Sequence, residues 1–244
     1  MTFSARARSA LLTVFLLVTA LCAPEAPARD MHATDLAPCG ANAPKQLTSL
    51  QSFITVHVAC DHLLLEIPAA MLDRSILVYT EFAGLSDGAS EQAPGGAVSN
   101  FVSRWIRSGN KVAMTTVKYD SWAGDHAGLK LGVEAVSLPA VIDVFDVIRE
   151  GDNGSSIIDI TSLFTTNVRR GFALDFMRRY RMARVDGRRS FIRNVRAFPN
   201  NVEIGSYQTW VPDEQDLLKP PPDEDPPPPS LAFSFKTNFM LLPD

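Results

Sequence analysis

The densest group of side chains suited to chemistry lies in the stretch HVACDHLLLE. It contains two of the four histidines of the chain, together with a cysteine and two carboxylates: His57, Cys60, Asp61, His62 and Glu66. Imidazole, thiolate and carboxylate groups are the usual zinc ligands, but their spacing here matches no zinc pattern, and the sequence has no H-E-x-x-H and no C-x-x-C. We interpret the group as exposed residues of a turn, and predict no metal ligand, no cofactor-binding residue and no catalytic residue in this chain.

The sequence also lacks two other catalytic signatures, the nucleophile elbow G-x-S-x-G and the phosphate-binding loop G-x-x-x-x-G-K. The carboxylates Asp143, Asp146, Asp159 and Asp175 are scattered along the chain, and nothing in their spacing selects a pair. We interpret them as parts of a solvated surface, where acidic side chains usually lie.

The segment with the most uneven charge composition is rich in arginine. Between Arg169 and Arg196 there are ten arginines against two aspartates, a local balance of +8 in a chain whose net charge is −4. Clustered guanidinium groups bind phosphate, sulfate or carboxylate, so a candidate anion-binding face consists of Arg188, Arg189, Arg193 and Arg196. The alternative is that their stems cover apolar surface while their charges pair with acids elsewhere, including those of the acidic segment 213–225.

The N-terminus has the pattern of a secretory signal peptide. Arg6 and Arg8 precede the apolar run ALLTVFLLVTALCA, and Ala26-Pro27-Ala28 offers small residues for cleavage. We therefore predict a signal peptide over residues 1–28 and an exported protein, either periplasmic or extracellular. No second apolar run approaches membrane-spanning length, and the acidic net charge gives no indication of nucleic-acid binding.

Two cysteines remain after that cleavage, Cys39 and Cys60. In an oxidising compartment such a pair favours a disulfide, and two unpaired thiols are the alternative.

The rest of the chain reads as short strands. Residues 29–47 are a flexible lead-in, residues 48–211 a β domain, residues 212–230 an acidic, proline-rich linker, and residues 231–244 a terminal strand. Strand-like runs occur at 53–59, 62–67 and 75–82, a hairpin at 99–119, a pair at 138–150 and 155–164, and two or three strands within 177–210. The segment 138–150 also fits helical spacing. We predict a mainly β fold of antiparallel sheets, sandwich-like or a meander, with few short helices.

Five segments, in order, carry a family resemblance. They are HLLLEIPAAMLDRSILVYTEF, SRWIRSGNKVAM, SIIDITSLF, RRSFIRNVRAFPNNVEIGSYQTW and MLLPD. The fourth contains Arg189-Ser190, Val195 and the run Phe198-Pro199-Asn200-Asn201-Val202-Glu203. Over residues 48–244 the chain resembles the N-terminal domain, of unknown function, of bacterial secreted zinc-dependent metalloproteases of the zincin type.

In that family an H-E-x-x-H helix far downstream holds the catalytic zinc, and this sequence contains no such motif. The resemblance therefore implies a non-catalytic domain that packs on or assists a peptidase domain, in cis in the family and in trans here, with zinc only in that other domain. An autonomous periplasmic binding module that uses the arginine face for an anionic ligand is the alternative, and a truncated gene product is a third.

Overall fold

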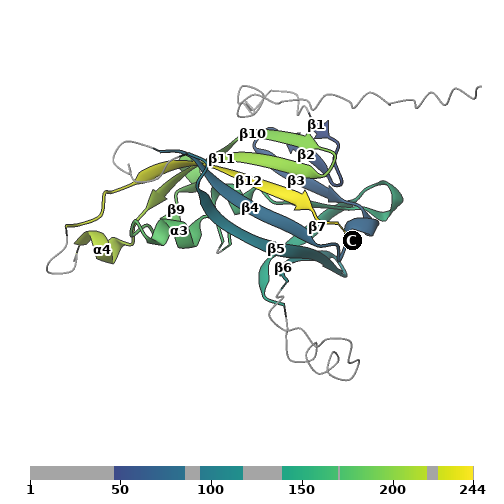
Figure 1. Ribbon diagram of the computed structural model, residues 1–244, viewed down its shortest axis with the longest axis horizontal. Helices are drawn as coiled ribbons and strands as arrows, with labels where there is room; N and C mark the ends of the chain where they lie inside the picture. Colours follow the sequence, from purple (N-terminus) through teal and green to yellow (C-terminus); the bar gives the residue numbers. More distant parts are fainter. Residues whose placement is uncertain (1–46, 86–93, 118–138, 170, 219–224, 244) are drawn as a thin grey trace, which may run out of the picture.

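A single antiparallel sheet forms the body of the protein (Figure 1). The computed structural model describes residues 47–85, 94–117, 139–169, 171–218 and 225–243. In this part of the chain the prediction of a mainly β, antiparallel fold is confirmed. The predicted signal peptide, most of the predicted lead-in and Cys39 lie outside the described residues.

The sheet has twelve strands, in the order β1-β2-β3-β8-β7-β6-β5-β4-β12-β11-β10, with β9 paired to β11. Their bounds are β1 Leu47–Leu50, β2 Thr55–Ala59, β3 His62–Ile67, β4 Ile76–Leu85, β5 Ala97–Ser108, β6 Lys111–Thr116, β7 Val141–Glu150, β8 Ser156–Asp159, β9 Arg184–Val185, β10 Phe191–Phe198, β11 Asn201–Val211 and β12 Leu231–Leu241.

Local sequence explains the hairpins. Gly109, with φ +58°, supplies the left-handed residue of the turn between β5 and β6. In β7 the buried Phe145 and Val147 alternate with the exposed Val144 and Asp146, the period of two that defines a strand. The alternative helix over 138–150 is therefore wrong.

Helical pieces are short: α2 Ser162–Thr165, α3 Leu174–Arg178, α4 Glu214–Leu218, and the 3-10 turns η2 Ala69–Met71, η3 Asp152–Gly154 and η4 Gly187–Arg189. Two of them correct the sequence interpretation. The segment 155–164 is a strand only to Asp159 and then enters α2, and the segment 177–210 begins in α3 before it reaches β9. Both helices bury apolar side chains against the sheet, among them Phe164 and Phe176.

The terminal strand β12 pairs with β4 on one side and β11 on the other. Its inward residues Phe233, Phe235 and Phe239 are 0–1% exposed. Phe82 of β4 contacts the first two edge-on, with ring centroids 6.1 and 6.4 Å away. Because aromatic side chains bury the largest apolar areas, β12 supplies a central part of the core.

The sheet curls until its two ends meet. In Figure 1, β1 to β3 lie behind β10 and β12. The backbone N–H of Phe53, between β1 and β2, donates to the carbonyl oxygen of Pro199, in the β10–β11 turn, at 3.1 Å. The core fills the concave side, with Trp105 and Trp210 both fully buried. Among the described residues no helix is long and apolar enough to cross a membrane.

Candidate functional site

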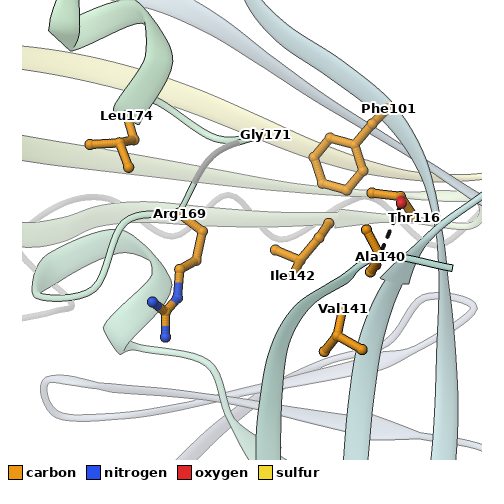
Figure 2. Close-up of a pocket in the computed structure, with 8 residues that line it drawn as sticks. All are labelled: Phe101, Thr116, Ala140, Val141, Ile142, Arg169, Gly171 and Leu174. Carbon is orange, nitrogen blue, oxygen red and sulfur yellow. Dashed lines mark hydrogen bonds between the residues drawn. The ribbon is translucent and has the colours of Figure 1, made fainter. Parts of the chain in front are cut away.

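A pocket of about 490 Å³ opens where β5, β6 and β7 meet the segment before α3 (Figure 2). Its lining is mostly apolar and consists of Phe101, Thr116, Ala140, Val141, Ile142, Arg169, Gly171 and Leu174. The size falls within the range of small-molecule sites. Phe101 is held in place by an edge-on contact with Phe172, at a centroid distance of 5.8 Å.

Arg169 is the one cationic side chain among the described residues that line the pocket. Its Nε donates to Oδ2 of Asp143 at 3.0 Å, and its Nη2 donates to Oδ1 of the same carboxylate at 3.3 Å. Asp143 is 14% exposed and Arg169 is 42% exposed, so the guanidinium faces solvent on one side and its partner on the other. Such a bidentate pair fixes the orientation of the guanidinium plane at the pocket rim.

The outer side of β7 carries an exposed apolar row that begins at the same pocket. We call Val141, Val144 and Ile148 the β7 row; they are 57%, 45% and 59% exposed. Val144 pairs with Ala113 of β6, which pairs with Ile106 of β5, so the apolar surface continues across neighbouring strands. The exposed Asp146, paired with Lys111, lies between Val144 and Ile148 on the same face. Exposed apolar side chains bordered by charged groups often mark a site where another molecule binds.

The four predicted anion-binding arginines occupy two places. Arg188 and Arg189 lie in η4, whereas Arg193 and Arg196 lie in β10. Arg189 Nε donates to Asp186 at 2.7 Å, Arg193 Nη1 donates to Ser234 at 3.4 Å, and Arg196 Nη1 lies 3.7 Å from Glu203 Oε1. Arg189 also bonds Ser230, and Arg181 bonds the carbonyl oxygen of Asp225. Asp225 and Ser230, at the described end of the acidic, proline-rich segment, therefore lie against this arginine-rich part of the chain.

The group around His57 differs from its sequence interpretation. Only Cys60 and Asp61 form the turn; His57 lies in β2, where it is buried, and His62 and Glu66 lie in β3. His57 is hydrogen-bonded to Glu66, whereas His62 is hydrogen-bonded to Asp159 at 2.7 Å, so the two imidazoles contact different carboxylates. Within the described residues no three His, Cys, Asp or Glu side chains are arranged to hold a metal ion. Cys60 is disulfide-bonded, and its pairing with Cys39 stays a prediction.

The fold and the pocket define a mainly β domain with a curled sheet and an apolar cavity at its side. By sequence, the chain belongs to the family described as domain of unknown function DUF5117, whose model matches residues 95–244. No curated protein and no solved structure matches the chain.

Sequence reasoning missed the pocket because its lining comes from four separate segments. Residues Phe101, Ile142 and Leu174 have no shared motif, and only pairing of β5, β6 and β7 brings the first two near each other. Arg169 lies in the arginine-rich segment, which was the one available signal, but its chemistry depends on Asp143, 26 residues earlier.

Proposed function

We propose that this chain is the N-terminal domain of an exported zinc-dependent metalloprotease-like protein, that it has no peptidase activity of its own, and that it packs on or assists a peptidase domain. The β7 row carries the proposal: three large apolar side chains on one strand are about half exposed, next to a pocket that can receive a partner side chain. The five-segment sequence resemblance supports a zinc-dependent peptidase domain as the partner.

Binding between separately produced chains tests this proposal. The full chain is titrated with a family peptidase domain that contains H-E-x-x-H, and the affinity is measured by calorimetry. The double variant V144T/I148T keeps β-branched residues on the strand but places hydroxyl groups in the contact. Because two apolar contacts are weakened, we expect binding about tenfold weaker or more.

Leu218→Gln is the matched control, because Leu218, on α4, is 72% exposed and lies outside the β7 row. This control is expected to bind like the unchanged chain. Equal affinity for the V144T/I148T chain, or no binding at all, would contradict the proposal. So would stoichiometric zinc with peptide turnover in the isolated chain.

The pocket favours a second candidate function, an autonomous binding module for a ligand with an apolar body and one anionic group. The apolar lining suits the body of such a ligand, and Arg169 is a cation at the rim. With decanoate as the probe, R169Q is expected to weaken binding about tenfold. Loss of binding in R188Q/R189Q/R193Q, with R169Q unaffected, would instead locate the site on the predicted arginine face.

A further inference from the structure

A serine, a histidine and a carboxylate form a continuous hydrogen-bonded chain on the outer side of β1, β2 and β3. Ser49 Oγ lies 2.8 Å from His57 Nδ1, and His57 Nε2 lies 2.9 Å from Glu66 Oε2. With Nε2 protonated and donating to Glu66, Nδ1 is free to accept the proton of the serine hydroxyl. A nucleophile, a base and a group that orients the base are the three parts of an activated serine.

The burial of the three side chains suits these roles. Ser49 is exposed, whereas His57 and Glu66 are 11% and 21% exposed. The hydroxyl of Ser155 donates to Oε1 of Glu66, the carboxylate oxygen that does not contact His57, and this bond fixes the orientation of the carboxylate. The Glu66 carboxylate is therefore held by Ser155 as well as by His57, and the nucleophile is the member of the hydrogen-bonded chain that faces solvent.

The strand register adds a hydrogen-bond donor next to Ser49. The N–H of Ile160 donates to the carbonyl oxygen of Leu63, so the backbone groups of Leu63 point toward β8. Backbone groups alternate along a strand, so those of Leu64 point toward β2, where its partner is His57. His57 thus bonds to β3, which makes Ser49–His57 a pair without mutual backbone bonds.

The N–H of Ser49 consequently points away from β2, toward the outer edge of β1. No described strand pairs with that edge. In hydrolases with an activated serine, the backbone N–H of the nucleophile is one of the donors that stabilise the oxyanion. The same edge presents the backbone groups of Leu47, two residues earlier, so an extended chain can align there as an added strand.

From this geometry we propose that Ser49 is a nucleophile for acyl transfer, with His57 as its base and Glu66 as the positioning carboxylate. The substrate class is an ester on an extended, peptide-like chain. Ser49 Oγ bonds to the acyl carbon while its proton moves to His57 Nδ1. The C–O bond of the ester then breaks, and the leaving alcohol takes that proton. Water, activated by His57 in the same way, releases the acid and restores Ser49.

A fluorophosphonate probe tests the proposal directly on the full chain. Ser49 Oγ is expected to form a bond to phosphorus with loss of fluoride, and mass spectrometry of the digested protein locates the modified serine. General-base catalysis contributes a factor of about 10² or more, so H57Q and E66Q are both expected to slow labelling strongly. E66Q nearly preserves side-chain volume, which keeps the test valid if H57Q fails to fold.

Ser108→Ala is the matched control, because Ser108 is an exposed serine at the β5–β6 turn. This variant is expected to label at the unchanged rate, while S49A loses the label. Labelling of Ser49 no faster than of Ser108, or labelling that is unaffected in a folded E66Q chain, would overturn the proposal. Binding to a peptidase domain is measured separately, so the two proposals succeed or fail independently.

Discussion

At the scale of single residues, Glu66 is the carboxylate on which the polar contacts of β2, β3 and the β7–β8 turn converge. Hydrogen bonds from Ser155 and then from His57 lower the pKa of Glu66 below its ordinary value of 4.5. The folded chain therefore favours the charged form more than the unfolded chain does. This contribution to stability is complete above the ordinary pKa and is lost as the pH falls through the lowered value.

The pH dependence of unfolding checks this assignment. Between about pH 5.5 and 3 the free energy of unfolding of E66Q is expected to fall less than that of the unchanged chain, because one shifted carboxyl is removed. Urea unfolding at stepped pH measures both slopes. Asp186, whose pKa is lowered chiefly by its hydrogen bond from Arg189, titrates in both chains and cancels in the difference. Parallel slopes would show that Glu66 has no lowered pKa.

Gly151 allows the carboxylate of Glu66 to approach the backbone. A Cβ at this position would overlap Oε1 of Glu66 and Oγ of Ser155. Gly151→Ala is therefore expected to lower the free energy of unfolding by about 1–3 kcal/mol. Gly84→Ala is the control, because its Cβ would lie an ordinary 3.7 Å from Ser234 Cβ. Equal effects in denaturant unfolding would contradict the close approach.

At this scale the sequence was a poor guide to the candidate sites. HVACDHLLLE showed that His57 and Glu66 are near each other in the chain, but not that strand pairing would bury His57. The contact with Ser49 depends on β1, whose four residues, LTSL, show no local pattern that predicts a strand. The pocket likewise depends on pairing between strands that are distant in the sequence, and the periodicity of a single segment does not reveal such pairing.

At the scale of elements, β4 connects the two parts of the sheet. It pairs with β12 along its whole length and with β5 from Ile76 to Glu81, yet it precedes residue 95, where the family match begins. Its buried residues Ile76, Val78 and Phe82 belong to the same core as the matched region. The folding unit is therefore larger than the matched segment.

Truncation tests this conclusion. A chain of residues 95–244 lacks β1 to β4, which leaves β5 and β12 with open edges and removes part of the core. We expect it to show no cooperative thermal transition, whereas residues 47–244 unfold cooperatively. Calorimetry and near-ultraviolet circular dichroism measure both, and an equal transition in the shorter chain would contradict the expectation.

Strand prediction succeeded where alternation was strong and failed where the chain leaves the sheet. The β5–β6 hairpin follows from apolar alternation and Gly109, and β12 from its alternating phenylalanines. The helices α2 and α3 were missed because each has at most five residues, too few for a helical period. Their helical form depends on packing against the sheet, not on propensity.

At the scale of the whole molecule, the curled sheet places the two candidate sites on different strands. The pocket and the β7 row lie on β5 to β7, whereas Ser49 lies on β1, the strand at one end of the order. A partner on the β7 row therefore leaves the β1 edge to a different molecule.

The position of β12 also governs when this sheet can form. Its partners β4 and β11 are made earlier, and both keep an open edge until residues 231–241 have left the ribosome. Domains with such distant pairings fold slowly, because the loop-closure entropy is lost before the contacts form. The growing chain consequently stays without the strand that joins β4 to β11 until residue 241 has been made, and during this time chaperones can bind the open edges.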